Sequence, residues 1–129
     1  MLETIGVIGA GQMGAGIAQV SAATGHDVLL GDVDLARAEA GKAAIAKALG
    51  RLVAKDKMAT ADADAVLGRI TPVADHAAFG PCDLVIEAAT EREAVKRAIF
   101  ASVGAHLSAT AILATNTSSI PITRLAQAA

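Results

Sequence analysis

The feature that most constrains the fold is a glycine pattern near the amino terminus. Gly9, Gly11 and Gly14 follow the β-branched run of residues 4–8 and open a segment of helical composition. The first glycine of such a pattern permits a tight turn, the second leaves space for a pyrophosphate, and the third lets helix and strand pack closely. Backbone N–H groups at the helix start, together with the helix dipole, attract an anion. The pattern therefore predicts a diphosphate site. The expected contact residues are Gly9, Ala10, Gly11, Gln12, Met13 and Gly14.

An acidic residue after the second apolar run narrows the choice of ligand. Asp32 follows residues 28–30, where a carboxylate accepts hydrogen bonds from the ribose hydroxyls of adenosine. Its negative charge repels a 2′-phosphate, so we expect NAD in preference to NADP. Arg37 is close enough in sequence to pair with such a phosphate, but Asp32 holds the deciding position. Alternatively, Asp32 caps the following helix, a role for which Asp34 is better placed.

The rest of the chain alternates between short apolar runs and longer, alanine-rich helical segments. We expect strands at residues 4–8, 28–30, 69–73, 83–88 and 111–114. We expect helices at residues 13–23, 35–55, 60–67 and 91–106, and a last helix from Pro121. Strands separated by helices of this length indicate a parallel sheet. The sequence therefore predicts one α/β domain over residues 1–129, a doubly wound Rossmann fold with a mainly parallel sheet and helices on both faces.

Apolar side chains at helical spacing mark the faces that two of these helices are expected to bury. In residues 13–23 the stripe consists of Met13, Ile17 and Val20. In residues 35–55 it consists of Ile45, Leu49, Leu52 and Val53. Thr60 is the expected N-cap of the helix at residues 60–67.

Composition argues against several classes of function. A net charge of −2 and only two aromatic residues disfavour nucleic-acid binding. Hydrophobic residues make up 53% of the chain, yet no run approaches the roughly 18 apolar residues of a membrane-spanning helix. The single cysteine, Cys82, fits a reducing cytoplasm, and we expect it to be a core residue. His26, His76 and His106 stand apart at turns and a helix end, so we expect neither catalysis nor metal binding from them.

Several of these segments together resemble the amino-terminal part of the L-3-hydroxyacyl-CoA dehydrogenase family. This family includes 3-hydroxybutyryl-CoA dehydrogenases and multifunctional fatty-acid oxidation proteins. Beyond the glycine turn and Asp32, the resemblance rests on residues 85–88 (Val-Ile-Glu-Ala), Glu91, Lys96 and residues 116–119 (Asn-Thr-Ser-Ser). It implies a homodimeric parent enzyme that oxidises L-3-hydroxyacyl-CoA to 3-oxoacyl-CoA with NAD, in fatty-acid β-oxidation or butanoate metabolism.

The same resemblance implies roles for individual residues. Glu91 and Lys96 match polar residues that contact the ribose on the nicotinamide side. Ser118 matches the serine that hydrogen-bonds the 3-oxygen of the substrate, and Asn116 lines the same loop. Lys55 matches a lysine that contacts coenzyme A. As alternatives, Glu91 and Lys96 belong to an exposed helix start, and Ser118 caps the helix near Pro121.

Two further features of the sequence bear on the substrate and on the strand ends. Lys47, Arg51 and Lys55 recur every four residues, so they share a helix face that either meets coenzyme A phosphates or is simply solvated. Ala48 stands where some relatives have a serine that contacts coenzyme A. Glu87 is interpreted as structural, at the end of its strand.

Oxidation of the substrate alcohol needs a general base that takes the proton of the hydroxyl group. None of the residues matched above has this role. Such a base is usually a histidine, and in the family it lies about twenty residues beyond the serine matched by Ser118. The sequence ends at Ala129. We therefore expect these residues to bind NAD without turning over substrate alone, and to self-associate through apolar surface around the last helix. Two alternatives stay open: a self-standing NAD-binding or redox-sensing module, and the NAD domain of another hydroxyacid or gulonate-type dehydrogenase.

Overall fold

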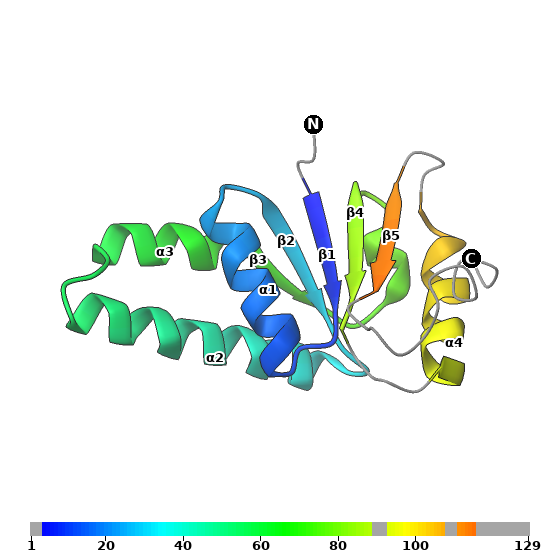
Figure 1. Ribbon diagram of the computed structural model, residues 1–129, viewed down its shortest axis with the longest axis horizontal. Helices are drawn as coiled ribbons and strands as arrows, with labels where there is room; N and C mark the ends of the chain where they lie inside the picture. Colours follow the sequence, from blue (N-terminus) through cyan, green and yellow to red (C-terminus); the bar gives the residue numbers. More distant parts are fainter. Residues whose placement is uncertain (1–3, 89–92, 108–110, 116–129) are drawn as a thin grey trace.

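The computed structural model describes residues 4–88, 93–107 and 111–115, which form a five-stranded sheet flanked by helices (Figure 1). The strands are β1 (Thr4–Ile8), β2 (Asp27–Gly31), β3 (Ile70–Val73), β4 (Leu84–Glu87) and β5 (Ile112–Thr115). The helices are α1 (Gln12–Ala23), α2 (Leu35–Ala54), α3 (Thr60–Gly68), the 3-10 turn η1 (His76–Phe79) and α4 (Glu93–Gly104). The expected last helix lies outside the described residues.

The strand order is that of a doubly wound sheet. It runs β3-β2-β1-β4-β5, and every neighbouring pair is parallel. The chain starts at the centre, winds to the β3 edge, and then crosses back to add β4 and β5 on the other side of β1. This order places the carboxyl ends of β1 and β4 at a switch point, where open α/β sheets bind their ligands. The predicted α/β Rossmann fold is confirmed.

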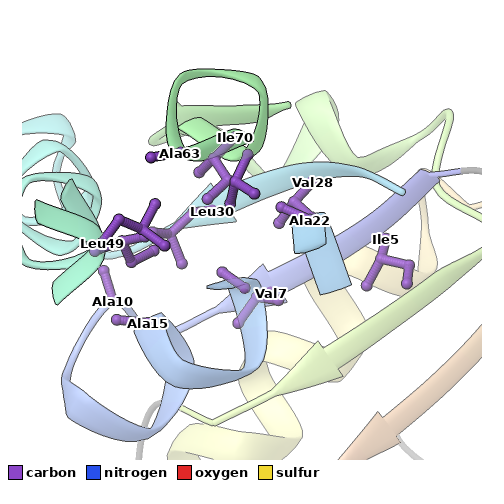
Figure 2. Close-up of a cluster of buried hydrophobic side chains, with 13 residues drawn as sticks. Ile5, Val7, Ala10, Ala15, Ala22, Val28, Leu30, Leu49, Ala63 and Ile70 are labelled. Carbon is purple, nitrogen blue, oxygen red and sulfur yellow. The ribbon is translucent and has the colours of Figure 1, made fainter. Parts of the chain in front are cut away.

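Side chains from the two faces of the sheet pack into two separate apolar clusters. Successive residues of a strand point to opposite faces, so Val7 and Ile8 of β1 belong to different clusters. The larger cluster lies beneath α1, α2 and α3 and includes Val7, Val28, Leu30, Leu49 and Ile70 (Figure 2). Ile45 belongs to the same cluster. The smaller lies beneath η1 and α4 and consists of Ile8, Phe79, Cys82, Val85 and Val103. Helices therefore cover both faces, as expected.

Two strand glycines make room for the only large aromatic ring among the described buried residues. A Cβ atom on Gly6 would lie 2.5 Å from Phe79 Cδ1, and one on Gly31 would lie 2.6 Å from Phe79 Cζ. Both distances are shorter than any real contact of this kind. The ring of Phe79 therefore packs directly on the backbone of β1 and β2, which anchors η1 to the sheet.

Helix α1 buries small residues rather than the large apolar stripe expected from the sequence. Its buried residues are Gly14, Ala15, Ala18 and Ala22. By contrast, Met13 is 61% exposed and Val20 is 68% exposed, while Ile17 is partly buried. The predicted face was wrong for Met13 and Val20, because α1 lies too close to the sheet for long side chains to fit between them. In α2, the expected face is confirmed, since Ile45 and Leu49 are buried.

Local capping differs from expectation at one helix and agrees at another. The N-cap of α3 is Ala59, with ψ 146°, and no side chain caps it. Thr60 is already the first helical residue, so the prediction that it is the N-cap was wrong. At α2, the carboxylate of Asp34 accepts a hydrogen bond of 2.8 Å from the N–H of Arg37, as expected. None of the helices within the described ranges is long and apolar enough to cross a lipid bilayer.

Candidate nucleotide-binding site

The first and third glycines of the turn have structural roles that the geometry makes explicit. Gly9 has φ +109°, a conformation that strongly favours glycine, and its N–H donates to Gly31 O at 2.7 Å. A Cβ atom on Gly14 would lie 1.6 Å from Gly9 O. The turn is therefore folded back on the start of α1 as tightly as two backbones allow.

The second glycine leaves the start of α1 open. A Cβ atom on Gly11 would meet nothing within 4 Å, and Gly11 is the N-cap of α1 without a side-chain hydrogen bond. Within this described helix, the first turn holds no acidic side chain. The N–H groups of this turn have no partner inside the helix, and they carry the positive end of its dipole. This open, uncapped helix start fits a diphosphate.

A further glycine, which the sequence pattern did not reveal, sets the packing behind the turn. A Cβ atom on Gly41 of α2 would lie 2.7 Å from Ala10 Cβ and 2.8 Å from Ala10 O. Helix α2 therefore supports the glycine turn from behind. A single glycine within an alanine-rich helix carries no local signal, so this contact emerges only from the fold.

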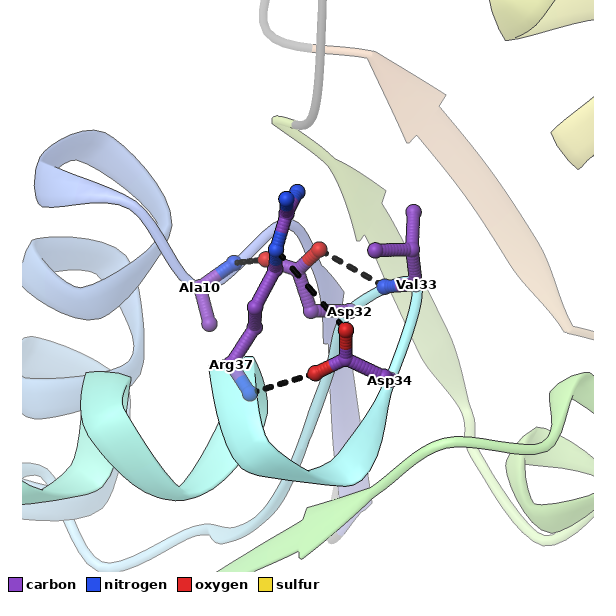
Figure 3. A network of polar contacts seen from close by, with 5 residues as sticks. All are labelled: Ala10, Asp32, Val33, Asp34 and Arg37. Carbon is purple, nitrogen blue, oxygen red and sulfur yellow. Dashed lines mark hydrogen bonds and ion pairs between the residues drawn. The ribbon is translucent and has the colours of Figure 1, made fainter.

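Asp32 links the end of β2 to the glycine turn. Its Oδ2 accepts a hydrogen bond of 2.8 Å from the N–H of Ala10, and its Oδ1 accepts one of 2.6 Å from the N–H of Val33 (Figure 3). An ionised carboxylate has about four lone-pair sites, so acceptor capacity remains for two ribose hydroxyls. The alternative that Asp32 caps α2 is not supported, because Asp34 does so. Arg37 Nε lies 3.8 Å from Asp34 Oδ2 in an exposed, weak ion pair.

A pocket of about 630 Å³ opens beside Asp32 at the carboxyl ends of β1, β2 and β3, a size typical of small-molecule sites. Its apolar walls come from the strand ends and from α4. They are formed by Ile8, Val33, Ala74, Val95 and Ile99. Asp32 and Gly9 also line it, so the pocket adjoins the glycine turn.

The structure also places residues that sequence reasoning had set aside. His76 and His106, expected to stand apart, both line this pocket, and His76 Nδ1 lies 2.7 Å from Ser102 Oγ. The segments involved are far apart in sequence and meet only through the crossover from β3 to β4. Among the described residues, no group of His, Cys, Asp and Glu is arranged to hold a metal ion.

The remaining predicted site residues are placed only in part. Lys96 lies in α4, whereas Glu91, Asn116 and Ser118 lie outside the described residues. Lys55 is exposed at the C-cap of α2, at the end of that helix away from the glycine turn (Figure 1).

Four other residues from the sequence analysis have a clear position. Lys47 and Arg51 are exposed on α2. Their exposure fits both alternatives, a solvated basic stripe and a phosphate-binding face. Glu87 is fully buried, in agreement with a structural interpretation. Cys82 is a buried core residue, as expected. Burial, with a smaller contribution from the charge of Asp83, raises the pKa of its thiol from 9.0 to about 11.

Comparison with known proteins agrees with this geometry. Residues 4–129 match the family model described as 3-hydroxyacyl-CoA dehydrogenase, NAD binding domain. A probable 3-hydroxybutyryl-CoA dehydrogenase of Deinococcus radiodurans is 49% identical over 95% of this chain and 44% of the relative. The 3-hydroxybutyryl-CoA dehydrogenase of Bradyrhizobium diazoefficiens is 49% identical over 99% of this chain and 44% of the relative.

A solved structure gives the same result. The crystal structure of (S)-3-hydroxybutyryl-CoA dehydrogenase from Ralstonia eutropha superposes with a TM-score of 0.95 at 39% identity, covering 99% of this chain and 45% of that one. The chain thus spans less than half the length of these relatives. The glycine turn, the doubly wound sheet and the family match all agree, and the chain belongs to the NAD-binding domain family of 3-hydroxyacyl-CoA dehydrogenases.

Proposed function

We propose that this chain holds NAD(H) for an enzyme that oxidises L-3-hydroxyacyl-CoA to 3-oxoacyl-CoA. The observation that carries the proposal is the bond between Asp32 and Ala10, which joins a ribose-binding carboxylate to an open, uncapped glycine turn. The diphosphate would lie over Gly11 at the start of α1, and the adenosine would extend past Asp32 into the pocket. When bound, the nicotinamide supplies the hydride acceptor of the reaction.

The chain's own residues then bind and orient the cofactor. The N–H groups of Gln12 and Met13 bind the diphosphate, and the carboxylate of Asp32 binds the adenosine ribose. Asp32 also disfavours a 2′-phosphate through its charge, which supports NAD rather than NADP. We assign the ribose on the nicotinamide side to Glu91 and Lys96, following the family resemblance.

The substrate and the assembly belong to the same proposal. The names of the relatives support an acyl-CoA substrate, with 3-hydroxybutyryl-CoA as the reference compound. In this proposal, Ser118 would contact the 3-oxygen of the substrate and Asn116 would line the same loop. Lys55 would contact the coenzyme A part of the substrate. A homodimeric parent, self-association of the 129-residue chain and a cytoplasmic location remain predictions of the sequence.

Cofactor binding is tested by titrating the 129-residue chain with NADH and NADPH in a calorimeter. We expect saturable binding of NADH and much weaker binding of NADPH. Asp32→Ala leaves ribose hydroxyls without an acceptor and frees the N–H of Ala10, so NADH affinity is expected to fall by about 1–3 kcal/mol. Asp34→Asn is the matched control, because asparagine caps a helix as well as aspartate does and Asp34 lies outside the pocket.

The result that contradicts the cofactor site is an Asp32→Ala variant that binds NADH as tightly as the wild-type chain. The substrate class is tested separately in the parent enzyme, by following NADH oxidation spectroscopically with acetoacetyl-CoA. Turnover of free hydroxy acids or keto acids without any reaction of the coenzyme A ester would exclude the acyl-CoA assignment and leave the cofactor assignment intact.

A further inference from the structure

The pocket beside Asp32 has an apolar part and a polar part. Its apolar walls, which Ile8, Val33, Ala74, Val95 and Ile99 form, are suited to a flat, unsaturated ring. The rest of the lining contains polar side chains. Besides Asp32, these are Asp75, His76, Ser102 and His106. Nonspecific stacking of a base requires only the apolar walls, so the polar part calls for a separate explanation.

The polar part is held in place by two local contacts. Asp75 Oδ1 accepts a hydrogen bond of 2.9 Å from the N–H of Ala77, which fixes the carboxylate against η1. His76 Nδ1 and Ser102 Oγ lie 2.7 Å apart and link η1 to α4. The ring of His76 also lies against that of Phe79, with centroids 6.5 Å apart. Asp75 is therefore an oriented acceptor at the start of η1, and η1 is linked to α4.

We infer that Asp75 reads the base of the dinucleotide, by accepting a hydrogen bond from the exocyclic amino group of adenine at its second oxygen, Oδ2. This inference rests on the proposed binding of NAD. Adenine carries an amino donor at C6, whereas a 6-oxo purine carries a carbonyl acceptor there. A carboxylate attracts the donor and repels the acceptor. The chain therefore selects adenine over hypoxanthine, and the bond between His76 and Ser102 positions the wall that makes the selection.

The test compares NADH with its reduced hypoxanthine analogue, nicotinamide hypoxanthine dinucleotide. We expect the wild-type chain to bind NADH about tenfold more tightly, as the loss of one charge-assisted hydrogen bond at a solvent-exposed site requires. Asp75→Asn keeps an oxygen for the N–H of Ala77 but offers the base a donor. It is expected to weaken NADH binding, to strengthen binding of the analogue, and so to abolish or reverse the preference.

Two further variants separate base recognition from folding. Asp75→Ser keeps a cap for Ala77 with a side chain too short to reach the base, so both dinucleotides are expected to bind about equally. Asp34→Asn removes the same charge outside the pocket and is expected to keep the wild-type preference. Thermal unfolding of each variant checks that the domain is intact.

The outcomes distinguish this inference from the proposed function. If the wild-type chain binds both dinucleotides equally, or if Asp75→Asn keeps the wild-type ratio, base recognition by Asp75 is wrong while NAD binding stands. If the wild-type chain binds neither dinucleotide, the cofactor assignment fails and this inference fails with it.

Discussion

Individual glycines of the turn separate the requirements of folding from those of binding. A Cβ atom on Gly14 would overlap the backbone oxygen of Gly9. A Cβ atom on Gly11 would lie in open space, and the backbone of Gly11 is extended (φ −71°, ψ −171°), a conformation that any residue adopts. We therefore expect Gly14→Ala to destabilise the fold by about 3 kcal/mol or more, because a backbone atom must move. Gly11→Ala is expected to leave stability unchanged but weaken NADH binding at least about tenfold.

Urea unfolding and calorimetric titration of the same variants measure the two effects. Gly16→Ala is the control, because Gly16 lies within α1 and a Cβ there meets nothing within 4 Å. It is expected to raise stability by about 0.5–1 kcal/mol through helix propensity alone. A Gly11→Ala variant with wild-type NADH affinity would mean that the diphosphate lies elsewhere.

Sequence reasoning was reliable for the first strand and for the glycine turn, where the signal is local. The strand at residues 4–8 was predicted with its exact bounds, and the roles of Gly9 and Gly14 followed from their spacing. The contact between His76 of η1 and Ser102 of α4 could not be predicted, because it depends on how two distant segments meet after the crossover. Local patterns specify elements and turns, whereas pocket walls depend on tertiary packing.

At the scale of elements, α1 shows why large apolar residues can mislead. Pattern analysis weights Met13 and Val20 by size, yet the sheet accepts only Ala15, Ala18 and Ala22 at the distance set by Gly14. Alanine contributes little hydrophobic signal per residue, so a helix that buries an alanine face presents its larger side chains to solvent. The close approach of α1 to the sheet at Gly14 therefore explains both the tight glycine turn and the wrong prediction of the buried face.

The connection between α2 and α3 contains the only non-glycine residue with positive φ in the described part of the chain. Asp56 has φ +56°, and the N–H groups of Asp56 and Lys57 donate to Val53 O and Leu52 O, as in a Schellman motif. Glycine adopts this conformation without a steric penalty, so Asp56→Gly is expected to stabilise the domain by about 0.5 kcal/mol.

A β-branched residue at the same position has the opposite effect. Asp56→Val is expected to destabilise the domain by about 1–2 kcal/mol, because its side chain clashes with the backbone in this conformation. Urea unfolding of both variants tests the pair. Equal stabilities for the two would show that the backbone at residue 56 is not held in the left-handed region.

At the scale of the whole molecule, the ionisation and reactivity of the Cys82 thiol measure whether the smaller cluster and the sheet above it stay folded. Its thiol is buried among residues of the smaller cluster, and its folded-state pKa is about 11 against 9.0 when exposed. Above pH 9 the unfolded thiol ionises while the folded one stays protonated. The stability that Cys82 contributes is therefore present below pH 9 and is lost as the pH rises to 11, by up to roughly 2–3 kcal/mol.

The comparison with Cys82→Ala isolates this effect from other titrations in the chain. Urea unfolding at pH 8 and pH 10 is expected to show a steeper loss of stability for the wild-type protein than for the variant. Alkylation of the native thiol at neutral pH is expected to proceed only as fast as the sheet opens. Identical pH slopes for the two proteins would show that the thiol is accessible in the folded state.

The bond between Asp32 and the N–H of Ala10 has a kinetic consequence. The turn that would receive the diphosphate is already ordered by a contact within the chain, with α2 supporting it through Gly41. Its conformational entropy is therefore lost during folding rather than on encounter with the dinucleotide. We expect association to be a single step limited by diffusion and orientation, with no slow isomerisation afterwards. A cofactor-specificity change made only at residue 32 would loosen this preorganised receptor and lower the rate of capture as well as the affinity.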